Sequence, residues 1–395
     1  GDNLTLTATM TYAHRDIHIT GSATGQTNSL FAAREGQNIA VSRVRHLNNL
    51  RAALYPAAVS GATITQSQAI DFDFKKWDKA DYLTLTNNPL QTFAPIENEK
   101  LLTRVTSNGG NNPIVGFPIA GEDNVGLFAA VKSGSLHHMR LVDFAVSGSG
   151  NRVGALAGQI TDTTVEDCGV YLNTLDDAGR FLPDLPQRLT QYTVKGKTYV
   201  GGLVGQALGN TALRDSFAAI SVTAVDCAGG LLGGYENKAF MEAVVNCYAS
   251  GGVAANPTTG RAGGLVGTVS NGGLSNCYST SDVTAAKAGG LVAVAANALL
   301  QDCKVYGRVE APSAGALVGN GSARYQGSCR FLIQAGYNEA LSRPAGVTAT
   351  DYDALKAVPP NGKENSHPYH SSLAKSAFPF PLLKTLPGML MPHYG

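Results

Sequence analysis

Two carboxylates and a guanidinium lie at matching or adjoining places in the chain, and together they could act on carbohydrate. Asp167 and Asp215 each precede a small or sulfur-bearing residue, and Arg214 adjoins Asp215. Hydrolysis of a glycosidic bond uses two carboxyl groups about 5–9.5 Å apart, and polysaccharide lyases pair acidic calcium ligands with a basic residue. If the chain is an enzyme, Asp167, Asp215 and Arg214 are therefore its candidate catalytic residues.

A charged stretch predicts a second kind of site, for binding. Residues 172–197 form the most charged part of the central region of the chain. Charged insertions that form loops often carry the contacts with a ligand. The predicted binding residues are Asp176, Asp177, Arg180, Asp184 and Arg188.

Several other kinds of chemistry lack their sequence signals. The chain has no Cys-x-x-Cys and no His-Glu-x-x-His motif, so we predict no metal site and no cofactor, with calcium on the acidic positions left open. The net charge of +1, without a basic stripe, argues against nucleic acid. No run approaches 18 apolar residues, so no membrane span is predicted. Because residue 1 is glycine, we expect a mature or trimmed piece of a longer protein.

These residues lie within an internal repeat. Glycine makes up 46 of 395 residues, and a Gly-Gly-Leu or Gly-Ala-Leu motif returns at separations of 47, 28, 34, 26 and 26 residues. The basic period is therefore about 26 residues, with two insertions. The copies are Val153–Leu156, Val200–Leu203, Ala228–Leu231, Ala262–Leu265, Ala288–Leu291 and Ala314–Leu317, after a degenerate copy at Val125–Phe128.

A second landmark keeps register with the first. About 13 residues after each motif comes a small or sulfur-bearing residue, and these positions are Met139, Cys168, Ser216, Cys247, Cys277, Cys303 and Cys329. We expect this column and the leucines to point inward, with the thiols free because side chains in a ladder run parallel. The preceding residue is always polar, which is typical of a turn that bonds its own backbone; an acidic stripe that binds calcium or sugar is the alternative.

The repeat predicts an all-β fold. Each copy contains strand-length segments bounded by turn residues and no helical apolar period, and 26 residues are too few for a propeller blade of about 40–45 residues. A unit of this size cannot bury its own apolar side and must stack on its neighbours. We therefore predict a right-handed parallel β-helix, or β-solenoid, of about seven coils, with an N-terminal α+β cap and an irregular C-terminal cap.

The repeat resembles the GLUG-type repeat family of bacterial surface proteins. The resemblance rests on Gly-Gly-Leu-Val-Gly at Gly201–Gly205 and Gly263–Gly267, and on Asn-Cys-Tyr at Asn246–Tyr248 and Asn276–Tyr278. The family includes adhesin-like chains and the non-catalytic parts of some IgA-cleaving metallopeptidases. The resemblance implies a β-helix outside a bacterial cell, as a scaffold without a reaction of its own.

Three regions follow from these patterns. Residues 1–122 form a capping region with a predicted helix over 42–54 and a strand over 68–74. Residues 123–335 form the repeat, with its insertion at 172–197, and residues 336–395 form a proline-rich irregular cap.

The functional prediction is a non-enzymatic, adhesin-like protein of the bacterial cell surface. It would present a binding face to glycans or proteins of a host or a neighbouring cell, as part of a larger chain with other domains. Two alternatives stay open: a carbohydrate-active enzyme, either a lyase or a glycosidase, and a purely structural spacer.

Overall fold

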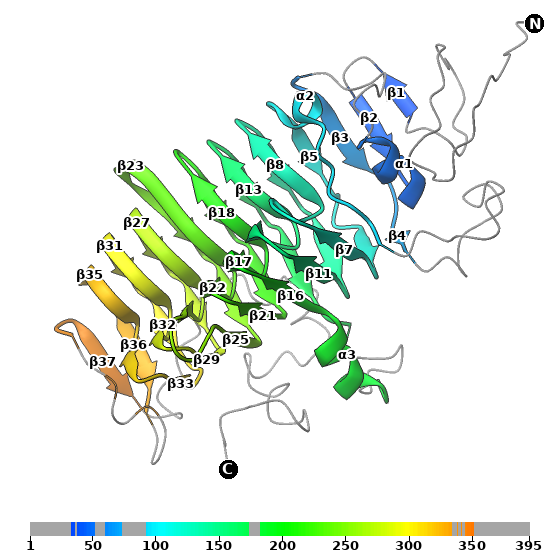
Figure 1. The fold of residues 1–395 in the computed structure, drawn as a ribbon. Helices are drawn as coiled ribbons and strands as arrows, with labels where there is room; N and C mark the ends of the chain where they lie inside the picture. Colours follow the sequence, from blue (N-terminus) through cyan, green and yellow to red (C-terminus); the bar gives the residue numbers. More distant parts are fainter. Residues whose placement is uncertain are drawn as a thin grey trace, which may run out of the picture.

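The chain winds into a parallel β-solenoid, as predicted. The computed structural model describes residues 33–35, 38–51, 60–72, 92–173, 182–333, 338, 341 and 344–350. Successive coils stack along one axis in sequence order, from the capping strands to β37 (Figure 1). Among the described strand pairs, β1 with β2 is antiparallel and the others are parallel. The three described helices are α1 (Val44–Asn49), α2 (Glu99–Leu102) and α3 (Leu185–Gln191).

Four sheets make the walls of the solenoid. The largest has 14 strands. They are β1 (Ala33–Glu35), β2 (Asn38–Val41), β3 (Thr63–Gln66), β5 (Thr106–Asn108), β8 (Phe128–Lys132), β9 (Ser135–His137), β13 (Ala157–Thr161), β14 (Thr164–Glu166), β18 (Val204–Leu208), β19 (Ala212–Arg214), β23 (Leu232–Val245), β27 (Val266–Ser275), β31 (Val292–Gln301) and β35 (Val318–Gln326).

The second sheet has 10 strands, and successive coils each contribute one strand to it. They are β4 (Ile70–Asp71), β6 (Pro113–Val115), β10 (Arg140–Val142), β15 (Gly169–Tyr171), β20 (Phe217–Ala219), β24 (Tyr248–Ser250), β28 (Tyr278–Ser279), β32 (Lys304–Val305), β36 (Cys329–Leu332) and β37 (Val347–Thr350). Each predicted repeat supplies one strand, from β10 to β36. The stack is longer than the repeat, because β4 and β6 extend it on one side and β37 on the other.

The third and fourth sheets have seven and six strands. The seven are β7 (Pro118–Gly121), β11 (Ala145–Gly148), β16 (Thr193–Gly196), β21 (Ser221–Ala224), β25 (Gly252–Ala254), β29 (Asp282–Thr284) and β33 (Val309–Glu310). The six are β12 (Asn151–Val153), β17 (Thr198–Gly201), β22 (Cys227–Gly229), β26 (Arg261–Gly263), β30 (Lys287–Gly289) and β34 (Ser313–Gly315). Strand β16 lies within the predicted insertion, so the end of that segment belongs to a coil.

The predicted inward columns are confirmed. All six leucines of the repeat motif are fully buried. The sulfur column is buried too, and every cysteine is a free thiol. Its thiols bond backbone carbonyls: Cys277 Sγ, for example, lies 3.2 Å from the Ser275 carbonyl and 3.4 Å from that of Val244, one coil back. The thiols thus have carbonyl partners, and Cys277 and Cys303 also interact with each other.

Aromatic residues one position after the sulfur column also stack in the interior. Phe217 and Tyr248 have ring centroids 5.1 Å apart, and Tyr248 and Tyr278 have centroids 4.9 Å apart with the rings inclined by 5°. All three residues are buried. The tyrosines therefore strengthen the packing between coils and form no exposed aromatic strip.

The N-terminal helix is shorter than predicted. Helix α1 spans Val44–Asn49, and Arg43 rather than Ser42 is its N-cap residue. Leu47 and Leu50 are buried against the first coils, which keeps the predicted apolar face.

We predict that the six thiols are free and unreactive in the folded protein. Burial raises the pKa of the Cys168, Cys227 and Cys247 thiols to about 12, so little thiolate exists at pH 8. An aromatic disulfide reagent should detect none in the native state and all six after denaturation without reductant. Val225→Cys, at a position 55% exposed, is the positive control and should react at once. A count near zero after denaturation would contradict the prediction.

Candidate functional site

One row of outward side chains runs along the largest sheet from coil to coil. Each member ends a strand segment, and the backbone register aligns each with the next. We call it the lateral row: Asn108, His137, Glu166, Arg214, Val245, Ser275, Gln301 and Gln326. Every member is at least partly exposed. The row is therefore an accessible face that spans eight coils.

A second column lies directly after the lateral row and turns the chain inward. Its members have left-handed backbone conformations, with φ between 48° and 54°. We call it the corner column: His138, Asp167, Asp215, Asn246, Asn276 and Asp302. Asn and Asp tolerate this conformation better than other side chains. The turn thus explains the polar residue before Cys168, Cys247, Cys277 and Cys303, whereas before Cys329 the left-handed position is taken by Gly327 and not by Ser328.

Side chains of the corner column also bond one another along the axis. Asn246 Nδ2 donates to Asp215 Oδ1 over 3.0 Å, and Asn276 Nδ2 donates to Asn246 Oδ1 over 2.9 Å. At the last coil, the Ser328 backbone N–H donates to Asp302 Oδ1 over 2.7 Å. This column therefore stabilises the stack of coils.

The candidate catalytic residues lie on neighbouring coils, but two of them have structural contacts. Asp167 Oδ1 accepts a bond of 2.7 Å from Nη2 of Arg140, whose side chain is almost fully buried. Asp215 accepts the bond from Asn246 and is itself buried. Arg214 belongs to the lateral row, in register with Glu166. No sequence pattern marks Arg140, the cation that holds Asp167.

The insertion is clamped to the solenoid by one of its predicted binding residues. Asp176, Asp177 and Arg180 lie outside the described residues, whereas Asp184 and Arg188 are at the start of α3 and within it. Arg188 Nη2 contacts the Asp143 carboxylate, and its Nε donates to the Asn173 carbonyl over 3.2 Å.

The partner of Arg188 is a carboxylate held deep in the coil. The Asp143 side chain is 6% exposed and that of Arg188 is 15% exposed. Burial raises the pKa of Asp143 from its ordinary value, and the Asn173 N–H and the guanidinium counteract that shift. Asp184 is half exposed, with Oδ2 3.5 Å from Arg188 Nη1, and is the outward-facing member of the group.

We predict that Arg188 fixes the insertion in place. Arg188→Ala leaves the Asp143 carboxylate buried without its guanidinium, which should lower the free energy of unfolding by about 3–5 kcal/mol. Urea unfolding and limited proteolysis at the insertion measure the effect. Asp184→Ala is the control, with an expected change within about 0.5 kcal/mol. Asp143→Asn in the Arg188→Ala background should recover part of the loss, and no recovery would contradict the explanation.

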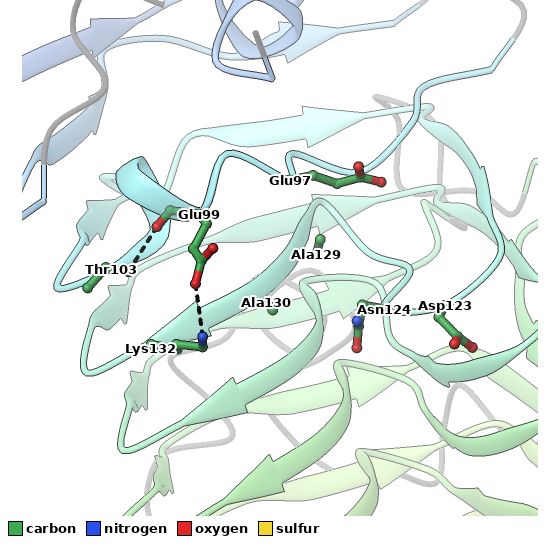
Figure 2. Close-up of a pocket in the computed structure, with 8 residues that line it drawn as sticks. All are labelled: Glu97, Glu99, Thr103, Asp123, Asn124, Ala129, Ala130 and Lys132. Carbon is green, nitrogen blue, oxygen red and sulfur yellow. Dashed lines mark hydrogen bonds and ion pairs between the residues drawn. The ribbon is translucent and has the colours of Figure 1, made fainter. Parts of the chain in front are cut away.

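A groove of about 280 Å³ lies where the N-terminal segment covers the first coils of the repeat (Figure 2). Its lining residues are Glu97, Glu99, Thr103, Asp123, Asn124, Ala129, Ala130 and Lys132. Lys132 Nζ pairs with Glu99 Oε1 at 3.1 Å, and Asp123 Oδ2 lies 3.8 Å from Arg152 Nη2. Sequence reasoning missed this groove, because it forms where α2 of the capping region packs against β8 of the repeat, and no repeated pattern marks that contact.

Among the described residues, no group of three or more His, Cys, Asp or Glu side chains could hold a metal ion. Nor is any helix of that part of the chain long and apolar enough to cross a membrane.

One acidic side chain titrates far from its ordinary range. Asp282 is partly buried, and this burial raises its pKa from 3.8 to about 7, although the Arg308 N–H donates to its Oδ1 over 2.9 Å. Asp282 lies in β29, on the sheet of seven strands.

We predict that Asp282 makes stability fall with rising pH. A folded-state pKa above the unfolded one means that the folded chain binds the proton more tightly, so this contribution is lost between about pH 4 and pH 7. Asp282→Asn keeps the acceptor for Arg308 and removes the buried charge. It should raise the free energy of unfolding more at pH 8 than at pH 5, by a difference on the order of 2 kcal/mol. Equal gains at the two pH values in urea unfolding would refute this.

Comparisons with known proteins find a distant similarity to a solved structure. No family model matches it, and none of the curated proteins is significantly similar. A crystal structure of a "putative immunoglobulin A1 protease" from Bacteroides ovatus is similar at 16% identity and a TM-score of 0.45. That match covers 81% of this chain and 86% of the other. At this identity and TM-score, the match carries no argument about activity.

Proposed function

We propose that this chain is a non-enzymatic, adhesin-like β-solenoid of the bacterial cell surface, of the GLUG-type repeat class. Its role is to present a lateral face to glycans or proteins of a host or a neighbouring cell. The repeat motifs of the sequence support the class. The solenoid supports the role, because stacked coils make an extended and regular surface.

The observation that carries the proposal is the different use of two adjacent columns. The corner column, where the acidic residues gather, bonds backbone and side chains of the next coil. The lateral row beside it faces solvent over eight coils. The two candidate catalytic carboxylates thus hold the fold, and the exposed row, which includes Arg214, is left for contacts.

The charged insertion remains the second proposed contact region. Asp184 points outward from its anchored end, and Asp176, Asp177 and Arg180 precede it in the chain. Arg188 supports this region by fixing it to the coil.

The enzyme alternative keeps one supporting observation. Asp167 and Asp215 are on neighbouring coils with Arg214 between them in the chain, as a carbohydrate-active site would need. The Arg140 contact to Asp167 counts against it, because a paired carboxylate is a poor general acid.

One incubation separates these functions. The purified chain is applied to an array of glycans and matrix proteins with calcium present, and the same glycans are checked for released fragments. We expect saturable binding without fragments. Fragments that disappear in Asp167→Asn and Asp215→Asn would establish the enzyme instead. The absence of any binding would favour the purely structural spacer.

A matched pair of variants tests the insertion. Asp176→Ala, Asp177→Ala, Arg180→Ala and Asp184→Ala are combined, with Arg188 kept so that the anchor stays intact. We expect at least a tenfold loss of binding if the insertion contacts the ligand. Lys195→Ala, on an exposed position of β16, is the control.

A further inference from the structure

The lateral row has the regularity of a polymer-binding surface. Its eight residues come from eight consecutive coils in strict backbone register. Neighbouring parallel strands are about 4.8 Å apart, so the row extends for roughly 34 Å along the axis. A ligand that follows it must be long and must offer bonding groups at short, repeated intervals.

The row is polar apart from Val245, and its charges balance. Glu166 is 48% exposed, and its Oε2 lies 3.6 Å from His137 Nδ1. Arg214 is aligned with Glu166 on the next coil. Gln301 and Gln326 add two amides, each able to donate and to accept, and the Ser275 hydroxyl, whose proton goes to Glu242, can accept. The row thus offers both donors and acceptors of hydrogen bonds and carries no net charge.

An exposed aromatic ring lies beside the C-terminal half of the row. Strand β23 bulges between Glu236 and Met241, and this bulge carries Phe240, whose side chain is 41% exposed. The ring covers Gly273: a methyl group built on that glycine would lie 3.3 Å from Phe240 Cζ. Arg324 Cζ lies 5.6 Å from the ring centroid and helps to fix the ring.

The bulge and the row are joined. Ser275 of the row donates its hydroxyl to the Glu242 carboxylate, at the end of the bulge. Gly273, which Phe240 covers, lies two residues before Ser275 on β27. A ligand that reaches Gln301 and Gln326 would therefore pass next to the Phe240 ring.

We propose that the lateral row binds an uncharged, extended polysaccharide that lies parallel to the solenoid axis, with one sugar ring against Phe240. This inference rests on the proposed function and names its ligand class. Hydroxyl-rich chains match a row that offers both donors and acceptors, and an aromatic ring packs against the apolar face of a sugar. A protein partner would call for an apolar interface centre and a polyanion for a basic row, and the charge balance fits neither.

Affinity gel electrophoresis of the whole chain tests the proposal. The probes are soluble galactomannan, xyloglucan and mixed-linkage β-glucan, with polygalacturonate as the charged comparison. We expect at least one neutral polymer to retard the chain and polygalacturonate to have less effect. Gln301→Ala with Gln326→Ala, and Phe240→Ala separately, should each weaken the retarding interaction at least tenfold.

The control variant changes an equivalent row on another wall. Lys195, Thr223 and Thr284 are exposed and follow the register of the seven-stranded sheet. Lys195→Ala, Thr223→Ala and Thr284→Ala together should change the interaction less than twofold. Since all these positions are exposed, the variants should keep the wild-type unfolding midpoint, which is measured alongside.

The outcomes distinguish this proposal from the one on which it rests. No retardation by any neutral polymer, or equal losses in row and control variants, would overturn the row proposal. If matrix proteins on the array still bind, the adhesin-like function survives that result. Released fragments, together with a loss of binding in the row variants, would instead retain the row and overturn the non-enzymatic function.

Discussion

The whole structure depends on the close approach of one coil's backbone to the next. The first glycine of the motif, present in all six copies, and the second, present in four of them, make this approach possible. A methyl group on Gly229 would lie 2.1 Å from the Leu232 carbonyl oxygen of the same coil, and one on Gly230 would lie 2.1 Å from the Gly264 carbonyl oxygen of the next. Such distances are impossible for a real side chain, so the first glycine closes a corner and the second admits the neighbouring coil.

This constraint sorts the residues of each repeat by role. Since every coil must follow the same path, inward positions stack as leucine, thiol and aromatic columns, and the corner needs a side chain that accepts positive φ. The polar residues of the corner column thus serve the backbone first. Side chains that the fold does not require remain at outward positions, such as the lateral row, and where the repeat is interrupted, as at the β23 bulge and α3.

The sequence predicted what is periodic and missed what is not. The solenoid, its seven repeat coils and the buried columns follow from spacing alone, because a fixed period implies equivalent places in the fold. The Arg188–Asp143 contact joins residues 45 positions apart, across an insertion, and no pattern marks it. Likewise the groove under α2 and the Phe240 bulge arise where the chain departs from its repeat. Asp176, Asp177 and Arg180 stay predictions, since they lie outside the described residues.

The alignment of the coils has a mechanical consequence. Hydrogen bonds between parallel strands point along the axis, so tension on one end of the chain loads only the outermost coil. That coil would peel away before the next is strained, releasing about 26 residues each time. At 3.3–3.6 Å per residue, each step would lengthen the chain by roughly 90 Å. A rod built this way can yield in steps under load and keep its remaining coils, and the face they carry, intact.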